Sequence, residues 1–149
     1  MQDDNNTTTV TVVAQTEKDM NTYDEYLTHQ AGHILEIQEA MDIYSRMVNA
    51  IAKCENEVKK ELWDDFVQRC VKYTKIRCDW EYMDYQDRID SDPGRTRTHD
   101  TVIDSINVLA RLAKKEGTDY SWREDLGEHR KRIGDFACFV TYITGISNR

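Results

Sequence analysis

The sequence predicts an all-α, single-domain helical bundle of four principal helices joined by short connecting helices. Two patterns lead to this prediction. Apolar residues recur at steps of three and four in successive segments, and no segment alternates strictly between apolar and polar residues for long. Because each amphipathic stripe must be buried against another, such helices pack into a bundle. The 149 residues are enough for one domain with its own core.

The first part of the chain is expected to divide into a tail and the start of the bundle. Residues 1–16 are rich in Asn and Thr and predict a flexible N-terminal tail, or one short strand packed on the body. From Glu17 onward apolar residues recur at helical spacing, so residues 17–149 are assigned to the helical bundle domain. Gly32 is a predicted point of interruption between this helical segment and the next helix.

Two long apolar stripes predict the next two helices. The first stripe consists of Ile34, Ile37, Met41, Tyr44, Val48 and Ile51. The second helix is expected from about Glu55 toward Ile89, with a stripe formed by Leu62, Phe66, Cys70, Tyr73, Ile76, Trp80 and Met83. At 1.5 Å per residue this helix would be about 50 Å long, which leaves room for a kink or a break.

The C-terminal half begins with the clearest loop signal. Residues 90–98 contain Pro93, followed directly by Gly94, and predict a loop. A helix is then expected from Thr98 or Asp100 to just before Gly117. After a short connecting helix at residues 120–127, the last helix should be central to the core. Its apolar face is formed by Ile133, Phe136, Ala137, Val140 and Ile143.

Composition argues against several classes of protein. Hydrophobic residues make up 39% and charged residues 32% of the chain, which is too polar for a membrane protein and too apolar for wholesale disorder. The N-terminus lacks the basic and apolar regions of a secretory signal, so a cytoplasmic location is expected. The net charge of −8 argues against nucleic-acid binding, because phosphate contacts need a basic surface.

The cysteines do not form the pattern of a metal site or a disulfide scaffold. They show no C-x-x-C pairing and lie within helical patterns, so all four are interpreted as reduced, mostly buried side chains: Cys54, Cys70, Cys78 and Cys138. The apolar neighbours of Cys138 should raise the pKa of its thiol and leave it unreactive. No glycine-rich phosphate loop or nucleophile elbow is present in the sequence.

Four acidic residues form a candidate metal site. Glu36 and Glu39, like Glu61 and Asp64, are three residues apart, so each pair shares a helix face and two antiparallel helices could hold Mg²⁺ among them. The spacing resembles the signature of all-α nucleoside triphosphate pyrophosphohydrolases, which implies a metal-oriented water that attacks a phosphate chain. The acidic residue such enzymes have just before the first motif is replaced here by Leu35. The favoured interpretation is that these carboxylates lie on solvated faces.

Histidines give a second candidate. His29 and His33 would share a helix face, and His99-Asp100 resembles part of the metal site of helical phosphohydrolases, with Asp104 or Asp135 as a last ligand. The spacings fit that site poorly. A helix start at which Asp100 faces the N-terminal dipole is the simpler interpretation.

An aromatic and acidic segment ends the second of the two long stripes. Trp80 fits the stripe, but Tyr82 and Tyr85 lie elsewhere around the helix, among Asp79, Glu81, Asp84 and Asp87. Exposed tyrosines favour a surface for self-association or for a protein partner.

The C-terminal part resembles a family. The segments His99–Asp104 and Arg132–Ala137, together with Gly117, Trp122 and Gly127, look like a small family of uncharacterised helical proteins of Gram-positive bacteria. The resemblance implies a helical fold and a cytoplasmic location but no activity. No candidate site outweighs its structural interpretation, and the aromatic and acidic segment offers contact residues. The favoured function is therefore a non-enzymatic, self-associating interaction module without a cofactor, and the alternative is the Mg-dependent pyrophosphohydrolase. Gly134-Asp135 further predicts close helix packing, with Asp135 bonded to a Trp, an Arg or a backbone N–H.

Overall fold

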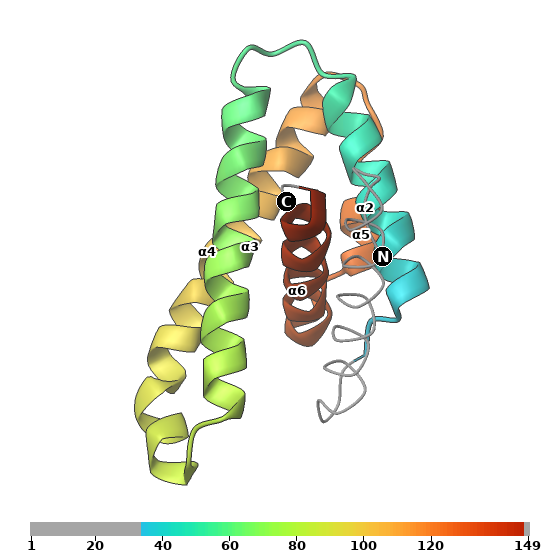
Figure 1. Ribbon diagram of the computed structural model, residues 1–149. Coiled ribbons are helices and arrows are strands. Elements are labelled where there is room, and N and C mark those ends of the chain that lie inside the picture. Colours follow the sequence, from blue (N-terminus) through green and yellow to red (C-terminus); the bar gives the residue numbers. More distant parts are fainter. Residues whose placement is uncertain (1–33, 148–149) are drawn as a thin grey trace. The chain divides into compact units, whose positions relative to one another are not determined.

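The computed structural model describes residues 34–147, which form five helices and no strand (Figure 1). These helices are α2 (Ile37–Ala52), α3 (Lys59–Glu81), α4 (Tyr85–Lys115), α5 (Ser121–Leu126) and α6 (Arg130–Ser147). The predicted all-α class, with four long helices and a short connecting one, is confirmed. The predicted tail at residues 1–16, Gly32 and the pair His29 and His33 lie outside the described residues.

The described residues belong to two compact units. Leu35–Thr141 is one, and it contains α2 to α5 and most of α6. Ile34 and the residues after Thr141 belong to the other. None of the described helices is both long and apolar enough to cross a membrane. Every candidate site residue that the structure describes lies in the unit Leu35–Thr141.

The core side of α2 differs from the predicted stripe. Of that stripe only Ile51 is buried, Met41 is exposed, and Tyr44 is half-buried against the rings of Trp63 in α3 and Phe139 in α6. The buried residues of the helix are Ala40, Ile43, Met47, Ala50 and Ile51. Two apolar rows run along α2, and the row with the small alanines lets the helix pack closely on α4 and α5.

The chain turns at residues 82–84 rather than at the predicted loop. α3 ends at Glu81, and α4 starts at Tyr85 and continues through Pro93 to Lys115, so the predicted loop at 90–98 is wrong. Asp84 caps α4 by accepting a hydrogen bond from the backbone N–H of Asp87 at 2.9 Å. In Figure 1 the two helices lie side by side, in agreement with their extensive contact.

The last helix is central to the core, as predicted. Of its predicted apolar face, Ile143 is half-buried and the other four residues are buried: Ile133, Phe136, Ala137 and Val140. Gly134 confirms the predicted close packing: a Cβ atom there would lie 2.7 Å from the hydroxyl oxygen of Tyr73 in α3, so only glycine fits without displacement.

Candidate functional site

The four carboxylates of the predicted magnesium site are exposed, and two of them have separate cationic partners. Both oxygens of Glu39 accept hydrogen bonds from the guanidinium of Arg132, at 3.2 and 2.6 Å. Asp64 lies 3.4 Å from the ammonium of Lys60, whereas Glu36 precedes the first residue of α2 and Glu61 lies in the first turn of α3. Among residues 34–147, no three carboxylate, histidine or cysteine side chains form a group that could hold a metal ion.

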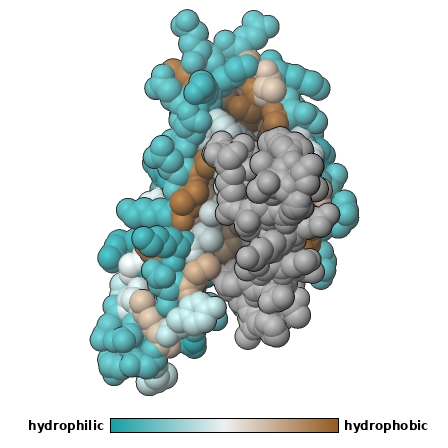
Figure 2. Space-filling model, in the orientation of Figure 1, coloured by the Kyte–Doolittle hydropathy of each residue, from teal (hydrophilic) through white to brown (hydrophobic). Residues whose placement is uncertain are grey.

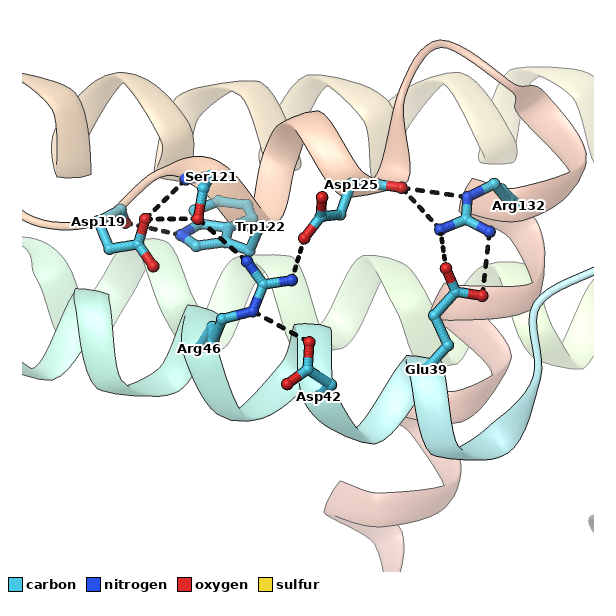
Figure 3. Close-up of polar contacts among 8 residues, drawn as sticks. All are labelled: Glu39, Asp42, Arg46, Asp119, Ser121, Trp122, Asp125 and Arg132. Atoms are coloured by element: carbon cyan, nitrogen blue, oxygen red, sulfur yellow. Dashed lines mark hydrogen bonds and ion pairs between the residues drawn. The ribbon is translucent and has the colours of Figure 1, made fainter.

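Glu39 belongs to a network that ties α2 to α5 and to the start of α6 (Figure 3). Arg132 also donates to the backbone oxygen of Asp125 at 2.7 and 3.2 Å. Arg46 donates to the carboxylates of Asp42 and Asp125 and to the hydroxyl of Ser121. Each guanidinium therefore binds two segments at once, which explains how the six-residue α5 keeps its place.

A hydrogen-bonded turn completes this network. The carboxylate of Asp119 accepts from the hydroxyl and the backbone N–H of Ser121, at 2.6 and 2.8 Å, and these bonds lower the pKa of Asp119. The indole N–H of Trp122, a fully buried residue, donates to the backbone oxygen of Asp119. The network therefore joins α2, the turn before α5 and the start of α6 through hydrogen bonds and ion pairs.

His99-Asp100 does not start a helix, so the capping prediction is wrong. Both residues lie inside α4: the imidazole of His99 is buried, with Nε2 2.7 Å from the carbonyl oxygen of Arg130, and Asp100 pairs with the Arg130 guanidinium at 2.8 Å. Asp104 is exposed. Nor does the alternative, a metal group around His99, form in the part of the chain that the structure describes.

Asp135 is instead part of a buried ion pair. It lies 2.9 Å from the guanidinium of Arg77 in α3 and accepts a hydrogen bond from the backbone N–H of Leu35 at 3.1 Å. These are two of the partners predicted for it. Arg77 also donates to the sulfur of Cys138 at 3.7 Å.

The cysteines are free thiols, and three of the four are buried. Burial raises the pKa of Cys70 well above its ordinary value and also raises that of Cys138. A thiol in this state is a poor nucleophile at neutral pH, as predicted for Cys138.

Among residues 34–147, the most exposed aromatic side chains lie at the turn between α3 and α4. Tyr82 is 91% exposed, Tyr85 is 79% exposed, and Ile89 is 49% exposed one helical turn after Tyr85. We call these three side chains the aromatic turn. Figure 2 shows pale and tan atoms among hydrophilic ones at this end of α3 and α4, at the lower left. The predicted exposure of the two tyrosines is confirmed.

Hydrogen bonds and ring contacts join the two helix ends beneath these side chains. Arg88 donates from its guanidinium to the backbone oxygens of Trp80 and Glu81, at 3.2 and 2.7 Å, and so caps the C-terminus of α3. The indole of Trp80 donates back to the carbonyl oxygen of Arg88 at 3.2 Å. The guanidinium groups of Arg88 and Arg95 lie 4.7 and 4.4 Å from the centre of the Trp80 ring, a cation–π geometry.

Comparisons of this chain with protein-family models, curated proteins and solved structures find no match. They give no support to the resemblance seen in the C-terminal segments.

Proposed function

We propose that this protein is a non-enzymatic interaction module that binds another protein chain through the aromatic turn. The observation behind the proposal is the exposure of Tyr82 and Tyr85 on one capped turn. Burying a large aromatic side chain in an interface is favourable, because its apolar surface leaves water. Such side chains are enriched in protein interfaces.

The contacts within the turn support the same proposal. The Asp84 cap, the Arg88 bonds to α3 and the contacts around Trp80 fix the backbone from which the tyrosines project. A tyrosine has only two rotatable side-chain bonds, so a partner would immobilise few degrees of freedom on binding. A fixed aromatic pair is the kind of anchor that dominates binding energy in interfaces.

The pyrophosphohydrolase alternative has no comparable support. Glu39 is neutralised by Arg132, and Asp64 lies beside Lys60. In a metal centre the carboxylates of Glu39 and Asp64 would have to face the same ion instead. The interaction module is therefore the function we retain, and a cytoplasmic location fits its four free cysteines.

Photo-crosslinking in living cells tests the proposal. In one variant a benzophenone amino acid replaces Gln86, an exposed residue of the turn. In a separate control variant it replaces Val58, which is exposed at the start of α3. We expect a discrete adduct from position 86 that is lost in the double variant Tyr82→Ser/Tyr85→Ser. Sequencing of the adduct then shows whether the partner is another protein or a second copy of the chain.

Two results would contradict the proposal. Position 58 could give the same adduct as position 86, or the serine variant could crosslink as efficiently as the original chain. Because both tyrosines are exposed, the double variant should unfold within about 0.5 kcal/mol of the original chain, so loss of the fold does not explain loss of the adduct. Sedimentation of the purified chain independently tests self-association.

A further inference from the structure

The charge around the aromatic turn is almost entirely negative. Between residues 79 and 92 the sequence contains six carboxylates and one guanidinium. Four of these carboxylates are exposed and have no cationic partner among the described residues: Asp79, Asp84, Asp87 and Asp90. Their hydrogen bonds, where present, come from neutral groups, namely the backbone N–H of Asp87 and the side-chain amide of Gln86.

The nearby cations do not compensate these charges. Arg88 bonds to the C-terminal carbonyl groups of α3 and lies over Trp80. Arg95 lies over the same ring and pairs with Asp92 at 3.0 Å. The exposed tyrosines therefore stand among carboxylates whose charge nothing in the described turn neutralises.

We infer that the aromatic turn binds a basic, arginine-containing segment of another protein. The inference rests on the proposed function and adds the chemistry of the partner. A guanidinium can lie flat on a tyrosine ring while its N–H groups bind a carboxylate, which a lysine ammonium does less well. The turn already shows this chemistry internally, where guanidinium groups cover Trp80 beside acidic residues.

The same charges oppose a symmetric dimer formed through this surface. Two copies meeting turn to turn would bring the unpaired carboxylates of both chains together, and like charges across an interface are destabilising. A cationic partner is attracted by these charges instead, and its affinity should fall as the salt concentration rises.

An NMR titration of the full chain tests the inference. The probe is a capped nine-residue peptide with three arginines separated by alanine and leucine, and its control has citrulline, the neutral isostere, at those three positions. We expect the arginine peptide to shift backbone amide signals of residues 79–92 and the citrulline peptide to leave them unchanged. Arginine-peptide shifts spread equally over other acidic faces, or no binding at millimolar peptide, would overturn the inference.

Matched variants separate this inference from the proposed function. Asp79→Asn/Asp87→Asn should weaken arginine-peptide binding about two- to thirtyfold, since the loss of each exposed ion pair weakens binding roughly 1.4- to 5-fold. The control Glu61→Gln/Asp64→Asn removes two exposed carboxylates elsewhere and should bind as the original chain does. Equal affinity of the two variants, or equal binding of the citrulline peptide, overturns the inference. Crosslinking at position 86 would still decide the proposed function by itself.

Discussion

Phe136 and Glu39 show how differently single residues contribute to this fold. The Phe136 ring is fully buried in α6, whereas the Glu39 carboxylate is partly exposed and paired with Arg132. Burying a phenylalanine removes a large apolar surface from water, and truncation adds the cost of a cavity. An exposed ion pair adds little to the stability of the fold, because water already stabilises both charges in the unfolded chain.

Phe136→Ala should therefore cost about 3–5 kcal/mol of unfolding free energy. Glu39→Ala should cost about 0.5–1 kcal/mol, near the upper end for a surface pair, because its contact with Arg132 is bidentate. Urea denaturation midpoints of both variants measure the difference. A loss below about 1 kcal/mol for Phe136→Ala would mean that the core lies elsewhere.

At the scale of the elements, α4 is the unexpected helix. Proline lacks an amide proton and costs roughly 3 kcal/mol inside a helix, so a Pro-Gly pair predicts a loop. Here the helix starts eight residues earlier, at a capped turn, and the segment beyond the proline is held by buried Thr98, His99 and Val102. These tertiary contacts outweigh local preference, and periodicity alone does not reveal them.

Pro93→Ala should raise the unfolding free energy by about 1–2 kcal/mol. Alanine restores the missing helix hydrogen bond, and only part of this gain is lost through the greater freedom of the unfolded chain. Pro93 is exposed, so little packing is lost. Thermal unfolding measures the change, with Thr96→Ala as an exposed control in the same helix. A lower melting temperature for Pro93→Ala would show that the ring itself stabilises α4.

At the scale of the whole molecule, patterns within a segment were predictable and pairings between segments were not. The four long helices, the core face of α6 and the exposed tyrosines follow from the spacing of residues along the chain. Arg132 pairs with Glu39, which is 93 residues away, and nothing in the local sequence around either residue predicts this pair. The same holds for Arg88, which caps the end of α3 although the apolar stripe continues to Met83.

The pH dependence of unfolding is a property of the whole molecule that His99 should influence. Burial is the largest cause and lowers the pKa of His99, although the hydrogen bond to the Arg130 backbone acts in the opposite direction. The unfolded histidine has a pKa near about 6.5, so its contribution to stability is fully present above that value. As pH falls below about 6.5 the unfolded chain binds a proton that the folded chain does not, and stability is lost until pH passes the folded pKa.

His99→Gln should therefore flatten the decline in unfolding free energy between about pH 7 and pH 5, a decline of at most about 1.4 kcal/mol per pH unit for one group. Glutamine does not titrate and can still donate to the Arg130 carbonyl. His129→Gln, at an exposed histidine, is the control and should leave the slope of the original chain nearly unchanged. An unaltered slope in His99→Gln would assign the pH dependence to other groups.

The positions of the three tryptophans make the protein's own fluorescence informative. Trp122 is fully buried, Trp63 is half-buried against Tyr44 and Phe66, and Trp80 lies under the guanidinium groups at the aromatic turn. A neutral quencher such as acrylamide should reach Trp80 and Trp63 before it reaches Trp122. Binding at the turn should change only the Trp80 share of the quenchable emission, whereas loss of the core exposes the protected Trp122. One unlabelled sample therefore distinguishes binding from unfolding.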